Sequence, residues 1–327
     1  MWLITDWLVQ SWELLQIRGW WFAAGLILCI IVTFLPLKAE KTKKNSIPFW
    51  SVVWGILFPV CNFAAIPLAV ALRNKGMRIG AVFAFLSAAV LLNPSGILSA
   101  WAYMGAELTV AWVISAVVVS LAVGMAGIWF LQPAEKEESK LQQKTADRIF
   151  SLSVPELAFW LALGTLAQAL LQALMPENFW QTLLMNPAEA SFGDAVAAGL
   201  FRHVCIPNDV SLAASLVATG FLPGWAVLFL TVGICTNLPE LFVLYGMAGK
   251  KPAALYGLVS VLAGIAAGVA TQLLLGVGFV PQFSLANAEP VIRIANLLSI
   301  GTWMPAKIPC ACLLAALALR GWWIRQK

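Results

Sequence analysis

Two short motifs place a cysteine, a proline and an asparagine inside otherwise apolar stretches of the chain. The first is Pro59-Val60-Cys61-Asn62, and the second is Cys205-Ile206-Pro207-Asn208. Thiolate sulfur prefers soft metal ions to magnesium or calcium. Cys61 and Cys205 are therefore candidate ligands for a soft metal ion or a metalloid. The alternative is that each packs as a small hydrophobic residue.

The single histidine of the chain lies beside the second motif. His203 precedes Cys205 by two residues, so it is a third candidate metal ligand in a mixed Cys/His site. A hydrogen-bonded histidine in the protein interior is the alternative interpretation.

Three further ionisable residues, Arg202, Asp209 and Glu240, fall within apolar segments of the second half of the chain. Ionisable residues in such segments usually mark substrate pathways or proton relays, which makes the three candidates for energy coupling. Two structural alternatives remain open. Arg202 and Asp209 pair with each other, or Glu240 closes a capping box with Asn237, three residues before it.

Asparagines precede the points where helices should restart. Asn93 is followed by Pro94, and Asn237 stands two residues before Pro239. The amides at a helix N-terminus attract anionic or polar groups, so Asn93 and Asn237 are candidate substrate-binding residues, as are Asn62 and Asn208. Simple helix capping is the alternative for all four.

Composition shows what kind of element must position these residues. Of the 327 residues, 61% are hydrophobic and only 11% are charged, whereas soluble domains carry roughly 25% charged residues. Several uncharged stretches exceed the roughly 17 residues that a helix needs to cross a bilayer. They run over residues 19–37, 45–72, 79–106, 108–134, 157–176, 210–239 and 252–288. The sequence therefore predicts an all-α polytopic membrane protein in contact with the lipid bilayer.

Several other classes of function find no support. The net charge of +5 comes from basic residues between apolar stretches, where they set orientation in the membrane, so we expect no nucleic-acid partner. The six cysteines lie almost wholly in apolar stretches, unlike the disulfide framework of a secreted protein. The sequence contains neither a GxxxxGK[ST] nucleotide-binding loop nor a CxxC or Ser/His/Asp arrangement, and it suggests no cofactor.

An internal repeat organises the chain. Shifting the sequence by 144 positions without a gap superposes residues of infrequent types on one another. The matches include Gly55 with Gly199, Cys61 with Cys205, Gly76 with Gly220, Gly80 with Gly224, Phe85 with Phe229, Asn93 with Asn237 and Gly105 with Gly249. Repeats of this kind are typical of secondary transporters, whose halves form one site at their interface.

The prolines predict two interrupted helices in each half, since proline removes a backbone donor and clashes with the preceding turn. We expect breaks at Pro59 to Asn62 with Pro67, at Asn93-Pro94, and at the matching places of the second half. If each Cys-bearing segment is a re-entrant hairpin, nearly all lysines and arginines fall on one side of the membrane. The halves are then inverted repeats with broken or re-entrant helices, and Arg18 and Arg293 remain on the outside.

The expected organisation has five parts. They are an interfacial amphipathic helix (1–18), a first transmembrane repeat (19–131), a cytoplasmic linker (132–153), a second repeat (154–276) and an extra C-terminal transmembrane helix (277–327).

The first motif, together with Leu72-Arg73-Asn74-Lys75-Gly76, Gly80 to Leu86 and Asn93-Pro94, resembles the YraQ/ArsP-like permeases. That family includes organoarsenical and metal-ion efflux proteins, and the stretch from Cys205 to Asn237 is similar to its second repeat. The resemblance covers residues 19–276 and aligns Cys61 with the first cysteine of a cysteine-rich tip. It implies a multi-pass permease of the bacterial inner (cytoplasmic) membrane that exports a small solute such as a metal ion or an arsenic compound.

The expected function is therefore secondary-active efflux through a central site that Cys61 and Cys205 line. The residues leave two alternatives open: an intramembrane thiol-dependent enzyme, and a membrane subunit of a larger complex.

Overall fold

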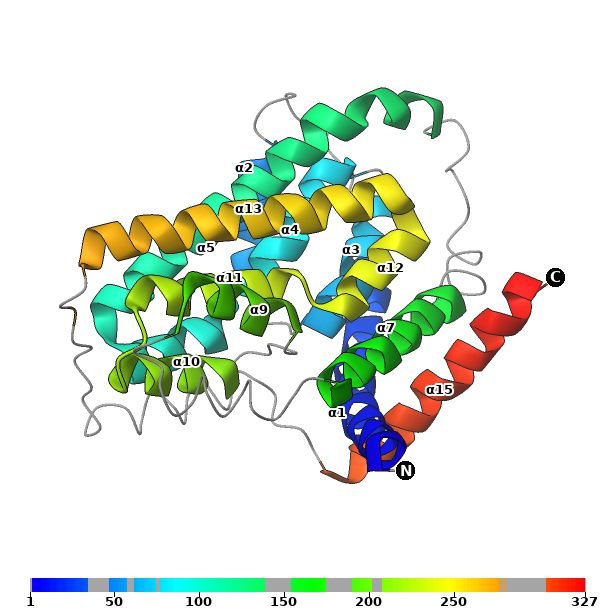
Figure 1. The fold of residues 1–327 in the computed structure, drawn as a ribbon. Coiled ribbons are helices and arrows are strands. Elements are labelled where there is room, and N and C mark those ends of the chain that lie inside the picture. The colour runs from blue at the N-terminus through cyan, green and yellow to red at the C-terminus, as the bar shows by residue number, and fades with distance from the viewer. Residues whose placement is uncertain are drawn as a thin grey trace.

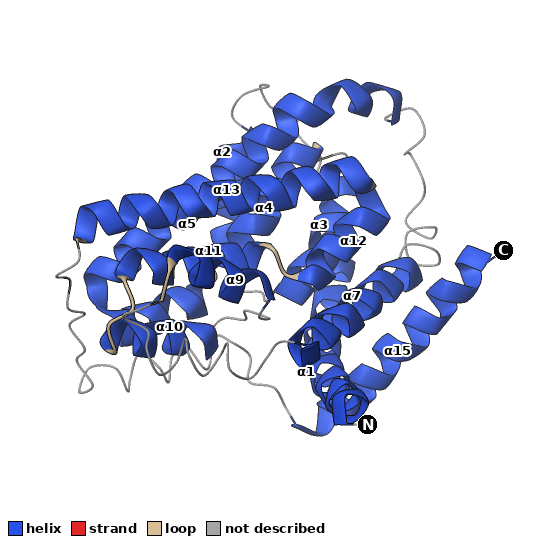
Figure 2. Cartoon of the chain, in the orientation of Figure 1, coloured by secondary structure: helices blue, strands red, loops and turns tan. Residues whose placement is uncertain are grey.

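Helices make up all the regular secondary structure in the part of the chain that the computed structural model describes (Figures 1 and 2). That part comprises residues 2–34, 47–57, 62–74, 77–138, 154–174, 190–201, 208–276, 279 and 304–326. The helices are α1 (Trp2–Phe34), α2 (Ile47–Leu57), α3 (Asn62–Asn74), α4 (Ile79–Leu91), α5 (Pro94–Glu138), α7 (Val154–Leu174), α9 (Phe192–Phe201), α10 (Asn208–Ala218), α11 (Pro223–Cys235), α12 (Leu238–Ala248), α13 (Lys250–Leu275) and α15 (Met304–Gln326).

Five of these helices are long and apolar enough to cross a membrane. They are α1, α5, α7, α13 and α15, and the bent pair α11 and α12 makes a sixth span if it is counted as one. The predicted all-α polytopic membrane fold is confirmed.

Helix α1 differs from the expected arrangement. It is continuous from Trp2 to Phe34, whereas the sequence had suggested an interfacial helix ending at residue 18 and a separate span after it. The apolar stretch suitable for crossing a membrane runs from Ile4 to Ile31. No proline stands between residues 2 and 34, so nothing forces the helix to end where its charged residues do.

The sequence repeat is also a repeat in three dimensions. Helix α4 shifted by 144 residues has the bounds of α11, and the starts of α5 and α12 are related by the same shift. Close helix contacts recur too. A Cβ atom at Gly80 would lie 2.6 Å from the carbonyl oxygen of Gly124, and one at Gly224 would meet the carbonyl oxygen of Gly268. These four glycines therefore let α4 approach α5, and α11 approach α13, in the same way.

The helix breaks fall where the asparagine-proline motifs predict them. Helix α4 ends at Leu91 and α5 begins at Pro94, while α11 ends at Cys235 and α12 begins at Leu238. Pro67 is an exception, because it lies inside α3, which continues to Asn74. The predicted break at Pro67 is therefore wrong, and the one predicted at Pro59 to Asn62 lies mostly outside the described residues. A proline within a membrane helix is tolerated where neighbouring groups satisfy the freed carbonyl.

A glycine also breaks the helix that follows in each half. Gly105 divides α5 into a short first part and a long second part, and Gly249 separates the short helix α12 from the long helix α13. Gly105 inside α5 has φ 78° and ψ 172°, and Gly249 between α12 and α13 has φ 89° and ψ −179°. Only glycine adopts this backbone region readily. Both halves thus contain the same glycine hinge.

The halves pack on each other reciprocally. Helix α3 of the first half contacts α12 of the second, α10 of the second contacts α5 of the first, and α5 packs along α13. Helices α1, α7 and α15 contact one another and form a group beside this core, at the lower right of Figure 1.

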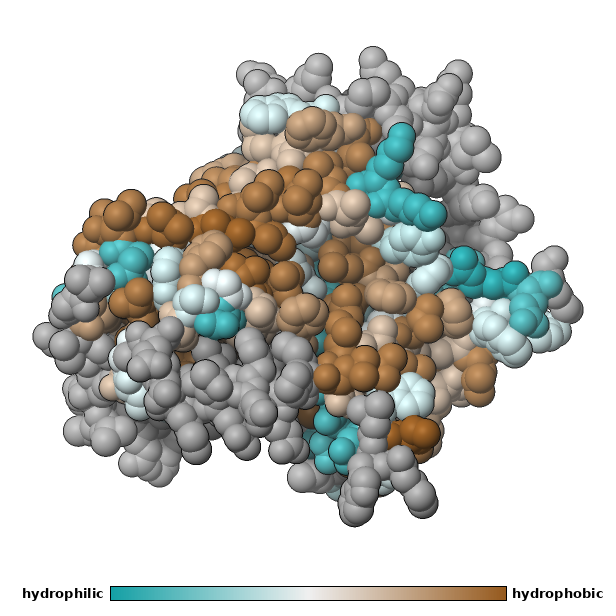
Figure 3. Space-filling model, viewed as in Figure 1, coloured by the Kyte–Doolittle hydropathy of each residue, from teal (hydrophilic) through white to brown (hydrophobic). Residues whose placement is uncertain are grey.

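The exposed faces are apolar, as a lipid environment requires. Ile114 and Val118 on α5 are exposed, and their counterparts in the repeat, Leu258 and Leu262 on α13, are exposed as well. Figure 3 shows hydrophobic side chains along the length of α13. The equivalent long helices therefore present equivalent apolar faces to the surroundings.

Candidate functional site

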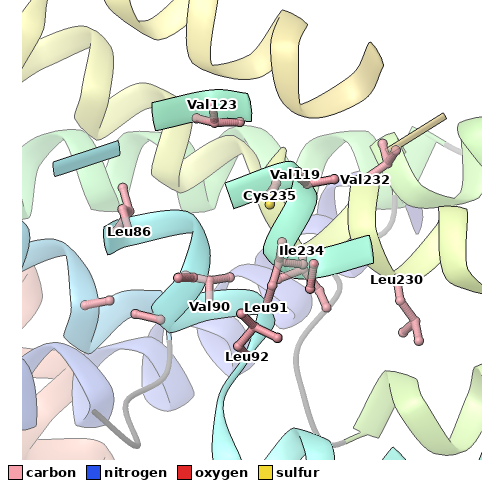
Figure 4. Close-up of a cluster of buried hydrophobic side chains, with 14 of the residues drawn as sticks. Leu86, Val90, Leu91, Leu92, Val119, Val123, Leu230, Val232, Ile234 and Cys235 are labelled. Carbon is pink, nitrogen blue, oxygen red and sulfur yellow. The ribbon is translucent and has the colours of Figure 1, made fainter. Parts of the chain in front are cut away.

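The ends of the two broken helix pairs meet in the interior. Leu91 and Leu92 at the end of α4, Ile234 and Cys235 at the end of α11, and Val119 of α5 belong to one buried cluster (Figure 4), and α4 contacts α11. Irregular backbone at membrane depth survives only where it is buried in protein or lines a water-filled cavity. The shared position of the breaks makes this region the candidate site.

Asn93 and Asn237 occupy equivalent breaks but bond differently. The Oδ1 atom of Asn93 accepts hydrogen bonds from the backbone N–H of Ser95 (3.0 Å) and from its hydroxyl (2.8 Å). Asn93 therefore caps α5, as the capping alternative predicts. The side chain of Asn237 does not cap α12, and its Nδ2 atom donates to the carbonyl of Ile234 (3.2 Å). Asn237 thus stabilises the end of α11 instead.

Most residues of the two Cys-bearing motifs lie outside the described residues, including Cys61 and Cys205, and so do the neighbouring His203 and Arg202. The helices that follow the motifs are described: α3 begins at Asn62 and α10 begins at Asn208. Both asparagines therefore stand at the start of a helix, and the breaks predicted before them lie outside the described residues.

Helix α1 packs against the beginning of α3, directly after Cys61 in the sequence. The buried guanidinium of Arg18 lies 5.0 Å from the centroid of the Phe63 ring. A Cβ atom at Gly25 would lie 2.6 Å from the Cα atom of Ala64, so the two backbones touch. Arg18 is thus a buried residue of the core.

Helix α7 contacts the end of α9, the helix that precedes the second Cys-bearing motif in the sequence. The buried Gln168 donates from Nε2 to the carbonyl of Phe201 (2.8 Å), the last residue of α9. This bond satisfies a carbonyl that the end of the helix leaves without an intrahelical partner. Gln168 therefore stabilises the C-terminal end of α9.

Asp209 occupies the first turn of α10 and is buried. A carboxylate in the first turn of a helix is stabilised by the exposed backbone N–H groups there. Its position favours a structural contribution and leaves the coupling hypothesis for Asp209 open.

A buried polar cluster surrounds Glu240. The hydroxyl of Tyr256 on α13 donates to Oε1 of Glu240 on α12 (2.7 Å), and the Tyr256 ring packs edge-on against Phe83 of α4 at 5.2 Å between centroids. The thiol of Cys235 and the hydroxyl of Ser260 lie beside them. Cys235, Glu240, Tyr256 and Ser260 are all fully buried, and we call them the Glu240 cluster.

The site contains no preformed cluster of metal ligands among the residues that can be placed. No three His, Cys, Asp or Glu side chains come together there. Cys235 lies in the Glu240 cluster, and Cys29 is buried as well.

Sequence reasoning missed Tyr256, Ser260 and Arg18. Tyr256 and Ser260 are four residues apart and therefore share one helix face, and Tyr256 is one of only three tyrosines in the chain. Arg18 lies in a stretch apolar enough to span a membrane. Each of these patterns is visible in the sequence once the bounds of the helices are known.

Comparison with known proteins adds one result. Residues 31–273 match a protein family described as predicted permeases. No curated protein and no solved structure matches the chain.

Proposed function

The chain belongs to this family of predicted permeases, and we propose that it is a secondary-active transporter that exports a small solute across the cytoplasmic membrane. The family and the apolar spans make it a multi-pass membrane transporter. The solute, the direction and the energy source are the proposed part.

The paired helix breaks are the observation that carries this proposal. Each half interrupts a helix at equivalent asparagines, Asn93 and Asn237, and the two halves pack on each other through α3 with α12 and α10 with α5. Secondary transporters built from repeats bind their substrates at such breaks, near the middle of the membrane. A substrate pathway between the halves would open to one side of the membrane or the other as the two repeats rock against each other during transport.

The two cysteine motifs suggest the class of solute. Cys61 directly precedes Asn62 at the start of α3, and Cys205 lies three residues before Asn208 at the start of α10. We propose that both thiols line one central site in the inverted repeats and bind a soft metal ion or a metalloid compound. Asn62, Asn93, Asn208 and Asn237 would line its polar walls, and His203 would be a further ligand.

An ion gradient is the proposed energy source, because the sequence has no nucleotide-binding loop. Asp209, Glu240 and Arg202 are the proposed coupling residues, and the first two are buried. Burying a carboxylate is costly unless the charge is paired or a proton neutralises it. Such a residue can therefore tie a conformational change to the binding of a cation.

Uptake into inside-out membrane vesicles tests the proposal, with a trivalent organoarsenical and a soft metal ion as probes. We expect energised vesicles with the native chain to accumulate a probe, and Cys61→Ser and Cys205→Ser to lose uptake at an unchanged protein level. Cys29→Ser is the matched control, because Cys29 is buried in α1. Equal uptake by all three variants would show that Cys61 and Cys205 do not bind the solute. No uptake of either probe by the native chain would contradict the proposed solute class.

A further inference from the structure

Four helix ends meet at one boundary of the molecule, at the right of Figure 1: the start of α7, the end of α12, the start of α13 and the end of α15. A Cβ atom at Gly321 of α15 would overlap the carbonyl oxygen of Pro155 on α7, and one at Gly246 of α12 would overlap the ring of Trp160, also on α7. Helices α12 and α15 therefore both touch α7 near its start. Helix α13 follows α12 directly, because only Gly249 separates them.

Exposed basic residues gather at these four helix ends. Lys250 and Lys251 begin α13, and Arg320 and Arg325 lie in the last two turns of α15. Among the described residues of these helix ends, Glu156 in the first turn of α7 is the only carboxylate. Figure 3 shows hydrophilic side chains near the junction of α12 and α13 and again at the C-terminal end of α15. This end of the molecule therefore carries an excess of positive charge.

Arg325 lies over two aromatic rings of α7. Its Cζ atom is 4.5 Å from the centroid of the Trp160 ring and 5.5 Å from that of the Phe159 ring. The negative face of an aromatic ring attracts a cation at about this distance. Within the described part of the chain, no carboxylate or other hydrogen-bond acceptor engages Arg325, so its N–H groups remain available to a ligand.

Helix α12 fixes the Trp160 ring in turn. The ring lies edge-on to that of Tyr245, with 5.2 Å between centroids, and against the backbone at Gly246. Tyr245 stands five residues before Lys250 in the sequence. The aromatic platform beneath Arg325 is therefore continuous with the helix junction that carries the two lysines.

Orientation in the membrane does not by itself account for this arrangement. The sequence predicts that most lysines and arginines face the cytoplasm, and an orientation signal requires only their charge. It does not require a guanidinium to rest on aromatic rings. In the first half, the residues equivalent to Lys250 and Lys251 are Ala106 and Glu107, so the repeated fold needs no cation after its glycine hinge. The basic and aromatic residues at this end are therefore candidates for a binding site.

The exposed residues of α15 place this site at the depth of the lipid headgroups. Trp322 and Trp323 are exposed close to Arg325 in the sequence, and Leu319 is exposed one turn before Trp323. Tryptophan concentrates at the boundary between hydrocarbon and water, where its ring is apolar and its N–H group reaches the headgroups. A lipid whose phosphate lies beside Arg325 can therefore lay its acyl chains along the apolar side of α15.

We propose that Arg325, Lys250 and Lys251 bind the phosphate of an anionic phospholipid of the surrounding membrane. The guanidinium forms paired hydrogen bonds to phosphate oxygens, while the lysines supply further positive charge. Basic pockets between transmembrane helices are suited to acidic headgroups in this way. The bound lipid links the C-terminal helix α15 to the start of α13. This site requires only the membrane fold, so it is independent of the solute and of the direction of transport.

Native mass spectrometry of the purified full-length chain in detergent tests the site, with phosphatidylglycerol and phosphatidylcholine of identical acyl chains as probes. We expect phosphatidylglycerol to bind more tightly. Arg325→Gln and Lys250→Gln should each weaken its binding about fivefold and leave phosphatidylcholine binding unchanged. Lys307→Gln, near the other end of α15, is the matched control and should bind both lipids as the native chain does. Equal affinity of the native chain for the two lipids would overturn the proposal, and so would equal losses in Arg325→Gln and Lys307→Gln.

Arg325→Lys separates this site from a general attraction between charges. The variant keeps the positive charge and loses the planar guanidinium, so its affinity for phosphatidylglycerol should fall several-fold. Full affinity would show that charge alone suffices and would overturn the proposed site. Melting temperatures in phosphatidylcholine check the fold of each variant, and the exposed Lys250 keeps the test decisive if replacement of Arg325 disturbs the packing of α15.

Glycerol phosphate, which has the charged group without acyl chains, distinguishes a lipid from a soluble anion. At the same concentration it should not displace phosphatidylglycerol, because it lacks the apolar contacts along α15. Displacement at equal concentration would assign the site to a free phosphate compound and overturn the lipid proposal.

Discussion

The hydroxyl of Tyr256 donates a 2.7 Å hydrogen bond to Glu240 across the hinge at Gly249. Both side chains are fully buried. This bond ties the short helix α12 to the long helix α13 on the side where the two halves of the protein meet. It fixes one angle between them in the structure described.

Tyr256→Phe should lower the free energy of unfolding by about 1–3 kcal/mol, since a buried carboxyl oxygen loses its donor. Thermal unfolding in detergent measures the loss. Tyr245→Phe on α12, where the side chain is 39% exposed, should change stability little. In a double-mutant cycle, Tyr256→Phe should cost much less in the Glu240→Leu background, which offers no acceptor, than in the native one. Additive losses would show that the two residues act independently.

Gly249→Ala should destabilise the protein by about 1–3 kcal/mol, although a Cβ atom there would touch nothing within 4 Å. The cost arises from the backbone, because φ is 89° at this position. Gly257→Ala on α13 is the control, where the nearest atom to a new Cβ is a flexible Leu241 side chain at 3.4 Å. The melting temperature of Gly249→Ala should therefore fall below the native value, whereas that of Gly257→Ala should stay at or above it. Equal values would contradict a strained hinge.

Gly80→Ala and Gly224→Ala should each destabilise the fold by about 1–3 kcal/mol, because the new methyl group meets backbone atoms that cannot move aside alone. At Gly80 the nearest backbone atoms are the Gly124 oxygen at 2.6 Å and the Ile128 nitrogen at 2.8 Å. Gly193→Ala, whose nearest contact is the Ser191 hydroxyl at 3.5 Å, should be tolerated. Thermal unfolding would reveal the difference, and similar losses in both halves would confirm equivalent packing.

The two break asparagines should respond in opposite ways to aspartate. Asn93→Asp retains the oxygen that caps α5 and should cost less than Asn237→Asp, whereas Asn93→Ala should cost about 0.5–2 kcal/mol through loss of the cap. Asn237→Asp replaces the Nδ2 donor to Ile234 with an acceptor and should be clearly destabilising. If both aspartate variants unfold at one temperature, the different bonding of Asn93 and Asn237 has no energetic consequence.

Much of the fold follows from local rules that the sequence displays. Apolar length predicts the spans, and the asparagine-proline motifs predict breaks that the structure places at Asn93 and Asn237. The sequence repeat aligns Gly105 with Gly249, but it does not reveal that both residues have positive φ. That conformation depends on how α5 and α13 pack, which is a tertiary property.

The site was harder to predict for the same reason. Glu240 stands out as a charge in an apolar stretch, whereas its partner Tyr256 is 16 residues away on another helix. Arg18 reads as a charge near a helix end, yet α1 continues past it and buries it against Phe63. Neither contact has a local signature, because each depends on two helices meeting.

Cross-linking of Cys61 to Cys205 tests most directly whether the two motifs form one site. The measurement uses the full-length chain in membranes, with the other four cysteines replaced by serine or alanine and a short bifunctional thiol reagent. We predict an intramolecular cross-link between residues 61 and 205, which the transported metalloid prevents by occupying both thiols. Efficient modification of each thiol without any cross-link between them would contradict a shared central site.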